Sequence, residues 1–280
     1  KNRSQVFGYY DHNMLVMSEK LSDHLPKTKR YNPKQRLWYI RANEVLISSG
    51  SIERPLVFGN NDTPGVMLSS AAKEYLKVYG VLVGKKPLIF TNNDSGYETA
   101  IEFKKNGVDP IILDTRKEPK SEIIDEAKKL DIKIKFSYVV VAAKGYKKVK
   151  SAEVAKISDD KNELGTLETI DCDCICVSGF WTPTIHLASQ SGNKTTFNKD
   201  IDAFVPGLSK QNETTLGAAS GTYTLDETLK SSFDSGYELS KKITKNDNKV
   251  SSPTVMEKKS TTHDKFWCVP LPKGKTYKRF

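Results

Sequence analysis

The segment from residue 86 to residue 141 alternates short apolar runs with helical patterns, and this alternation constrains the fold most strongly. Apolar runs bounded by turn residues predict strands, and apolar residues spaced three and four apart predict helices. The predicted strands cover 86–91, 108–114 and 132–141, and the predicted helices cover 98–106 and 122–130. This β-α-β-α-β order predicts a parallel sheet with right-handed crossovers, the arrangement of a nucleotide-binding unit.

The loop after the first of these strands departs from a dinucleotide fingerprint. It runs from Thr91 to Gly96 and contains one glycine, whereas the fingerprint needs several for a tight turn and for close approach to a pyrophosphate. Asp94, near the start of the following helix, would repel a phosphate. Asp114 ends the next strand, where a ribose-binding acid belongs. The loop favours a structural unit over one that holds a ligand, and both interpretations stay open.

The flanking segments predict further elements. Alternating or apolar runs predict strands at 6–10, 14–18, 36–41, 139–143, 146–157 and 171–177. Helical patterns cover 67–79, which ends at the usual capping residue Gly80, and 225–242. A short β-branched run at 45–47 predicts a buried strand that ends in Ser48-Ser49-Gly50-Ser51. Small residues at a strand end let another backbone or a ligand phosphate approach closely, because no bulky side chain stands in the way.

Three of the four cysteines, Cys172, Cys174 and Cys176, alternate with other residues. Alternate residues of a strand share one face, so the spacing predicts all three on the same side. Structural zinc sites place two to four residues between ligands and use a second pair of ligands. Only Cys268 remains elsewhere in the sequence. We therefore interpret the three cysteines as small buried side chains, and we expect no metal.

The net charge of +10 is concentrated near the C-terminus. Residues 241–280 contain eleven Lys and Arg against three Asp and Glu, a balance of +8. Aromatic residues rarely alternate with the basic ones, so we expect no nucleic acid partner. No run approaches the roughly 18 apolar residues that a membrane helix needs, and Lys1–Asp11 lacks the apolar core of a signal peptide. We expect a cytoplasmic protein with no membrane partner, and we interpret the chain as an internal piece of a longer protein.

Several motifs resemble a known family. They are Glu53-Arg54-Pro55, Asn61-Asp62-Thr63-Pro64-Gly65, the stretch from Ser178 to Gly192, Ala203-Phe204-Val205-Pro206-Gly207, and Thr215-Leu216-Gly217-Ala218-Ala219-Ser220-Gly221. In these motifs the chain resembles the α subunit of heterotetrameric sarcosine oxidase, which belongs to the two-dinucleotide-binding-domain flavoprotein superfamily. The sequence departs from the family at Ser48-Ser49, where Ala-Thr is usual, and at Phe180, where a second glycine is usual. Phe180 narrows the room for a ligand backbone.

The resemblance implies the fold and the domain organisation. The implied fold is α/β, the FAD/NAD-binding two-domain fold of disulfide oxidoreductases. It has a three-layer parallel sheet, a β-meander and an inserted second nucleotide-binding domain. The first dinucleotide-binding domain is expected to comprise 1–79 and 168–245, the inserted NAD-binding-like domain 80–167, and a basic linker toward a folate-binding domain 246–280. The glycine-rich strand of the first domain is expected to precede Lys1, so we expect the segment alone to be inactive and to bind nucleotide weakly or not at all.

The resemblance also implies function and site residues. The family oxidatively demethylates sarcosine to glycine and passes the one-carbon unit to tetrahydrofolate, with β and smaller subunits as partners. We expect NAD as the cofactor of this chain and FAD as a possibility, with FMN and tetrahydrofolate in the full complex. An acid common at the closing turn of relatives is absent here, and its absence is compatible with NAD. No residue is a convincing catalytic acid, base or nucleophile. The expected cofactor contacts are Gly50, Ser51, Arg54, Gly179, Trp181, Gly207, Gly217, Ala218 and Gly221.

Two alternatives remain open at this stage. One is the α subunit of a related amine, proline or opine dehydrogenase, whose substrate site would lie outside this chain. The other is a non-catalytic scaffold whose altered loops no longer hold a ligand. The nucleotide content of the protein distinguishes the scaffold from the two enzymes.

Overall fold

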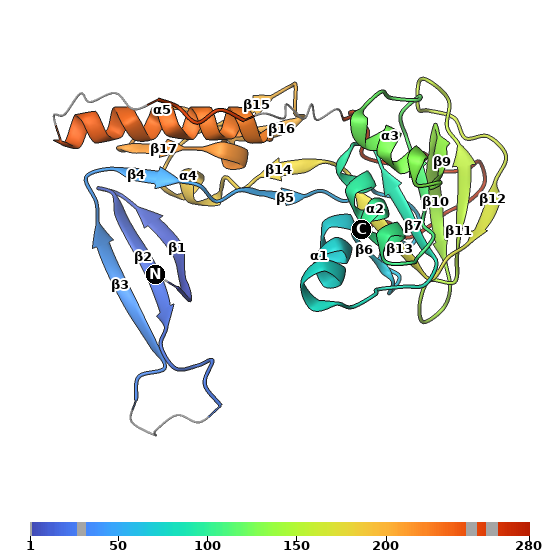
Figure 1. Cartoon of the computed structure of the whole chain (residues 1–280), viewed down its shortest axis with the longest axis horizontal. Coiled ribbons are helices and arrows are strands. Elements are labelled where there is room, and N and C mark those ends of the chain that lie inside the picture. Colours follow the sequence, from blue (N-terminus) through green and yellow to red (C-terminus); the bar gives the residue numbers. More distant parts are fainter. Residues whose placement is uncertain (1, 27–31, 245–250, 256–262) are drawn as a thin grey trace. The chain divides into compact units, whose positions relative to one another are not determined.

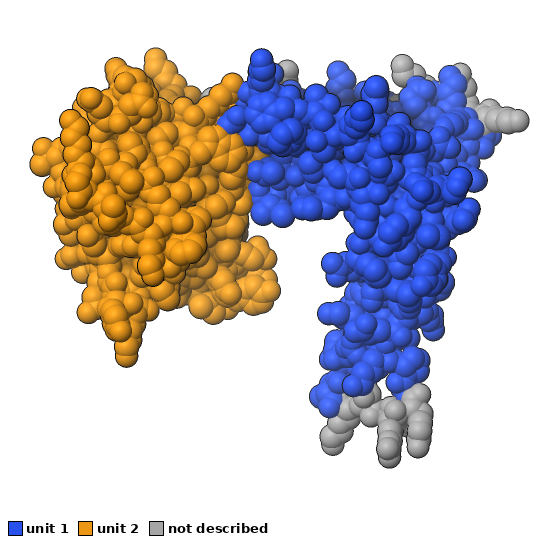
Figure 2. Space-filling model, turned by 180° about the vertical axis from the view of Figure 1, so that it is seen from behind, with its two compact units in different colours: residues 1–52, 182–259 blue, residues 53–181, 260–280 orange. Residues whose placement is uncertain are grey.

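The structure is a computed structural model that describes residues 2–26, 32–244, 251–255 and 263–280. Its contacts divide the chain into two compact units, coloured separately in Figure 2. Unit 1 comprises residues 1–52 and 182–259, and unit 2 comprises residues 53–181 and 260–280. The chain leaves unit 1 within β5 (Ser51–Glu53) and returns within β14 (Trp181–Pro183), and these two strands pair with each other. It passes to unit 2 once more between residues 259 and 260.

Unit 2 is built on a five-stranded parallel sheet in the order β6-β13-β7-β8-β9 (Figure 1). The strands are β6 (Val66–Leu68), β7 (Pro87–Thr91), β8 (Ile111–Asp114), β9 (Lys133–Phe136) and β13 (Cys174–Ser178). Helices α1 (Ser69–Tyr79), α2 (Ser95–Lys105) and α3 (Glu122–Lys129) share one hydrophobic cluster with one face of this sheet. The alternation of helices and parallel strands confirms the α/β fold class expected from the sequence.

An antiparallel meander covers the other face of the unit 2 sheet. It consists of β10 (Tyr138–Lys144), β11 (Ser151–Lys156) and β12 (Glu168–Asp171). Successive side chains of a strand point to opposite faces, so Leu88 and Phe90 of β7 join the meander cluster while Ile89 joins the helical cluster. The result is three layers, with helices, sheet and meander in that order.

Two local expectations differ from the structure. The predicted strand 132–141 is divided at Ser137, whose φ is 53°, so β9 joins the parallel sheet and β10 begins the meander. The three cysteines do not share a face, because β13 begins only at Cys174. Cys174 and Cys176 belong to the helical cluster, whereas Cys172 belongs to the meander cluster.

Unit 1 contains several small sheets. An antiparallel sheet joins β1 (Ser4–Tyr10), β2 (Met14–Lys20) and β3 (Gln35–Arg41), as the sequence predicted. A parallel pair joins β4 (Val45–Ile47) and β17 (Glu213–Thr215), and a hairpin joins β15 (Thr195–Asn198) and β16 (Ala203–Pro206). The helices are α4 (His186–Gln190), the 3₁₀ turn η1 (Gly217–Ser220) and α5 (Leu225–Thr244). None of the helices in the described part of the chain combines the length and apolar character that a membrane span requires.

The two units differ from the domains expected from the sequence. The expected first domain included residues 53–79 and 168–181, but β6 and β13 form hydrogen-bonded ladders in the same sheet as β7. The expected linker 246–280 also differs, because Phe266 and Val269 are buried in the meander cluster of unit 2. Residues 246–250 and 256–262 of that linker lie outside the described residues.

Candidate functional site

In unit 1, two small-residue turns leave the sheet at the same edge. Strands β4 and β17 are parallel, with Ile47 opposite Thr215. The Leu216 N–H donates to the Ile47 carbonyl oxygen at 2.8 Å, so the turns at 48–51 and 217–221 begin side by side. The carboxyl ends of parallel strands are where open α/β sheets place their ligands. The structure therefore brings Gly50 and Ser51 to the same edge as Gly217, Ala218 and Gly221.

The glycines of this edge have conformations that other residues adopt poorly. Gly50 has a φ of +74° and Gly217 has a φ of +63°. A Cβ built on Gly50 would meet no atom within 4 Å, so internal packing does not require the small residue there. Gly207 differs, because its Cβ would lie 2.4 Å from the Lys194 carbonyl oxygen. Gly207 is thus explained by packing in the β15–β16 hairpin, whereas Gly50 leaves space that a ligand backbone or phosphate can approach.

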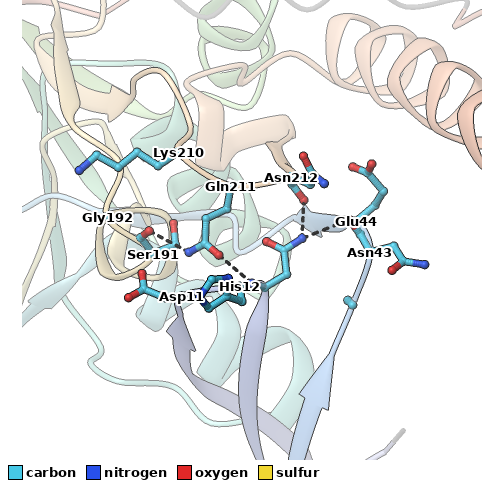
Figure 3. A pocket seen from close by; sticks show the side chains of 11 residues that line it. Asp11, His12, Asn43, Glu44, Ser191, Gly192, Lys210, Gln211 and Asn212 are labelled. Atoms are coloured by element: carbon cyan, nitrogen blue, oxygen red, sulfur yellow. Dashed lines mark hydrogen bonds between the residues drawn. The ribbon is translucent and has the colours of Figure 1, made fainter.

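Unit 1 also has a cavity of about 740 Å³ at the opposite end of the same strands (Figure 3). Its lining includes residues 42–44, which precede β4, and residues 210–212, which precede β17. Gln211 Oε1 accepts from the Asn13 N–H at 2.7 Å, and Asn13 Nδ2 donates to the Asn212 carbonyl oxygen at 3.1 Å. These bonds join the β1–β2 turn to the start of β17. Sequence reasoning did not find this cavity, and none of the predicted cofactor contacts lines it.

In unit 2, the predicted contacts Arg54, Gly179 and Trp181 are engaged in internal contacts. The Arg54 guanidinium lies 3.2 Å from the centroid of the Trp267 ring, and its Nε donates to the Gly179 carbonyl oxygen at 2.9 Å. A Cβ on Gly179 would lie 2.7 Å from the Arg54 carbonyl oxygen. Trp181 Nε1 donates to Ser95 Oγ at 2.8 Å. The structure places these three residues in unit 2, and the other six predicted contacts fall in unit 1.

A buried charge network joins the loop after β7 to the segment after β8, and Arg116 lies at its centre. Its guanidinium pairs with Asp94 at 2.7 Å and with Asp114 at 2.8 Å, and its side chain is only 7% exposed. Burial alone would lower the pKa of Arg116, but the hydrogen bond and charge of Asp114, joined by those of Asp94, raise it above its usual value. Asp114 also accepts from the Tyr97 hydroxyl at 2.7 Å. The two acids singled out in the sequence are therefore both paired with one cation of the same unit.

The backbone N–H of Ser95, at the start of α2, likewise has its hydrogen-bond partner within unit 2. Asn93 Oδ1 accepts from the Ser95 N–H at 2.8 Å. Asn93 Nδ2 donates to the Ser178 carbonyl oxygen at 3.0 Å, which joins the loop to the end of β13. The Ser95 amide would face a phosphate in a nucleotide-binding loop. Here the Ser95 N–H instead donates its hydrogen bond to the Asn93 side chain.

Residues 263–266 lie across the carboxyl edge of the unit 2 sheet. Asn92 Nδ2 donates to the carbonyl oxygens of Asp264 at 2.9 Å and Phe266 at 3.1 Å. Thr115 Oγ1 donates to the Asp264 carboxylate at 3.3 Å, and Lys161 forms an ion pair with the same carboxylate. Arg116 and Asp264 were not predicted from the sequence. The position of Arg116, two residues after Asp114, was a visible signal in the sequence, but no local pattern marks Asp264.

The comparisons with known proteins agree with the resemblance noted in the sequence. No family model matches the chain. Over 228 residues it is 37% identical to sarcosine oxidase subunit alpha of Rhizobium meliloti (strain 1021), covering 79% of this chain and 21% of that protein. It is 33% identical over 224 residues to the subunit alpha of Corynebacterium sp. (strain P-1), covering 79% of this chain and 23% of that protein. The chain thus spans about a fifth of the length of the curated relatives it matches, and the resemblance to sarcosine oxidase α subunits is confirmed.

Solved structures confirm the fold. The flavoprotein disulfide reductase RclA of Escherichia coli has a TM-score of 0.57 at 16% identity, covering 88% of this chain and 51% of that chain. The thioredoxin reductase of T. acidophilum has a TM-score of 0.53 at 16% identity, covering 68% of this chain and 62% of that chain. The L-proline dehydrogenase of P. horikoshii has a TM-score of 0.50 at 19% identity, covering 77% of this chain and 36% of that chain. The chain has the two-domain nucleotide-binding fold that these proteins share.

Proposed function

We propose that the chain is the dinucleotide-binding part of an oxidoreductase subunit of the sarcosine oxidase α type. In this proposal the complete enzyme demethylates sarcosine oxidatively to glycine and passes the one-carbon unit to tetrahydrofolate. The chain works in the cytoplasm with a β subunit and smaller subunits, which provide the FMN and the substrate site. The support is the 37% identity to a curated α subunit over 228 residues. No residue of the chain is assigned a catalytic role, and the chain alone is expected to be inactive.

The single observation that carries the dinucleotide assignment is the meeting of the Gly50 and Gly217 turns beyond β4 and β17. Both glycines have positive φ, and the space beside Gly50 is open, so the edge fits a pyrophosphate approached by backbone N–H groups. Gly50, Ser51, Gly217 and Ala218 would hold the dinucleotide. A nicotinamide or flavin supplies the hydride chemistry when bound.

The composition of the second turn favours NAD over FAD. The turn reads Gly217-Ala218-Ala219-Ser220-Gly221 and contains no carboxylate. Flavoproteins of this fold commonly place an acid there, facing the ribitol chain of the flavin. The full-length protein should therefore release NAD on denaturation, and mass spectrometry identifies it. Released FAD would contradict NAD and favour a flavin-bearing relative, such as an amine, proline or opine dehydrogenase subunit. A folded protein without nucleotide would favour a scaffold.

A matched pair of glycine variants tests the edge directly. Gly50 and Gly107 have φ values of +74° and +79°, and a Cβ on either would meet no atom within 4 Å. Replacing each by alanine should destabilise the protein equally, by about 1 kcal/mol, because of the positive φ. In the full-length protein, Gly50→Ala should weaken NAD binding about tenfold or more, measured by isothermal titration calorimetry, and Gly107→Ala should leave it unchanged. Wild-type affinity in Gly50→Ala would contradict the proposed site.

A further inference from the structure

The carboxyl edge of the unit 2 sheet is covered by residues 263–266, which we call the strap. The strap contacts the segment after each of three neighbouring strands. It bonds to Asn92 after β7 and to Thr115 after β8. The His263 ring stacks on Phe180, after β13, with ring centroids 3.9 Å apart and planes 7° apart. These three segments are where an open α/β sheet binds a ligand.

The contacts of the strap resemble those of a ligand more than those of a surface loop. Its backbone is hydrogen-bonded to Asn92. The side-chain Nδ2 of Asn92 donates to two carbonyl oxygens of the strap, and the Asp264 N–H donates to the backbone carbonyl oxygen of Asn92 at 2.9 Å. Its carboxylate accepts from Thr115 and pairs with Lys161. Its aromatic end, Phe266, is 6% exposed and joins the meander cluster. Hydrogen bonds, a carboxylate and a buried aromatic side chain thus hold the strap at this edge of the sheet.

We propose that the strap is a built-in competitor that closes the ligand crevice of unit 2, so that a dinucleotide enters this unit only when the strap is displaced. The proposal concerns unit 2 and does not depend on the dinucleotide assigned to unit 1. Unit 2 has the alternating strands and helices of a nucleotide-binding unit, yet the position of the ligand is taken by a segment that begins 85 residues after the end of β13.

Competition of this kind weakens binding in inverse proportion to the fraction of molecules in which the strap is open. If the strap is open about 1% of the time, the apparent dissociation constant of a ligand rises about 100-fold. Removing contacts of the strap should raise the open fraction and should not create any new contact with the ligand. The Asp264 carboxylate is the best contact to remove, because its partners Thr115 and Lys161 both lie outside the strap.

A thiol placed under the strap measures whether the crevice is closed. Thr115 is 2% exposed, so Thr115→Cys carries a reporter that Ellman's reagent reaches only when the strap lifts. The exposed natural thiol is removed by Cys268→Ser, and Cys172, Cys174 and Cys176 are buried. Both reporter proteins lack the Thr115 hydroxyl, so adding Asp264→Ala removes the ion pair with Lys161, and it should speed modification at position 115 about tenfold. Asp159→Ala, which removes an exposed ion pair with Lys117, is the control and should leave the rate unchanged.

The same thiol shows whether a dinucleotide competes. NAD at millimolar concentration should slow modification in the Asp264→Ala protein and should have no effect when Asp264 is present. The reporter lies in unit 2, so failure of NAD binding in unit 1 would not alter this readout. Equal modification rates with and without Asp264 would overturn closure by the strap. NAD protection in the presence of Asp264, or none in its absence, would overturn competition.

Discussion

The charge of Arg116 stabilises the loop after β7 and the end of β8. Its guanidinium is the partner of both Asp94 and Asp114, and Asp114 is fully buried. Removing one member of a buried ion network leaves the remaining charges uncompensated and destabilises a protein by roughly 3–5 kcal/mol. Arg116→Ala should lower the free energy of unfolding by that amount, measured by urea denaturation. Lys117→Ala removes a neighbouring cation whose side chain is 76% exposed, and it should change stability by less than about 0.5 kcal/mol.

Glu53 gives unit 2 a pH dependence of definite sign. Burial raises the pKa of Glu53, while the hydrogen bond from the Ser70 N–H, at 2.7 Å, acts in the opposite direction. A carboxyl whose folded pKa is raised holds its proton in the folded protein after the unfolded chain has lost it. Its contribution to stability is therefore present at low pH and is lost as pH rises from the unfolded pKa through the folded one.

Glu53→Gln should remove this pH dependence. The glutamine oxygen can still accept from the Ser70 N–H, and no buried charge forms. The variant should be more stable than wild type at pH 8, by about 1 kcal/mol, and should differ less at pH 4. Urea titrations at the two pH values measure the difference. A wild-type protein more stable than the variant at pH 8 would show that the ionised carboxylate is favoured in the fold.

Single residues were predictable where a local pattern specifies them. Gly80 ends α1 in the left-handed region, with φ 63°, as its position after the amphipathic pattern predicts. Asp94 and Asp114 were singled out in the sequence, but Arg116 was not, although it lies two residues after Asp114. The pair between Arg116 and Asp94 spans 22 residues and leaves no periodic signal. The Thr115–Asp264 bond spans 149 residues and depends entirely on the tertiary fold.

At the scale of elements, the segment after β13 is fixed by backbone proximity at Gly179. A Cβ there would lie 2.7 Å from the Arg54 carbonyl oxygen and 2.9 Å from that of Pro55. Backbone atoms cannot move aside as a flexible side chain can, so Gly179→Ala should destabilise unit 2 by about 1–3 kcal/mol. Gly236 in α5 meets nothing within 4 Å, and Gly236→Ala should stabilise its helix by about 0.5–1 kcal/mol. Thermal unfolding should therefore shift in opposite directions, and equal shifts would contradict the packing role of Gly179.

Elements were predicted best where periodicity is local and worst where assignment needs a partner. The helix expected at 122–130 and the strand expected at 86–91 are present within a residue or two. The sheet to which a strand belongs is a non-local property, so β13 was expected in the first domain although it lies between β6 and β7. Nor does an apolar run reveal where it changes sheets, as the run at 132–141 does at Ser137.

At the scale of the whole molecule, the two units bury very different amounts of apolar surface. Among the residues that the structure describes, unit 2 contains clusters of 19 and 14 buried residues, whereas the cluster of unit 1 contains 4. In addition, α5 contributes no buried residue to unit 1. Burial of apolar area is the main source of folding free energy, so unit 1 should open more readily than unit 2.

Native-state hydrogen exchange distinguishes the units amide by amide. The ladder amides of β7 and β8 lie inside the parallel sheet of unit 2, while Val45 and Leu216 belong to the two-stranded β4–β17 pair. We expect the unit 1 amides to exchange about 100-fold faster or more, which corresponds to an opening free energy lower by roughly 2.7 kcal/mol. Saturating NAD should slow Val45 and Leu216 toward the unit 2 rates if the dinucleotide binds at the Gly50 and Gly217 turns, because a ligand that binds only the folded form stabilises it. Equal protection of both units without ligand would show that the small core of unit 1 is sufficient by itself. Slower exchange confined to β7 and β8 would place the dinucleotide in unit 2 and contradict the assigned edge.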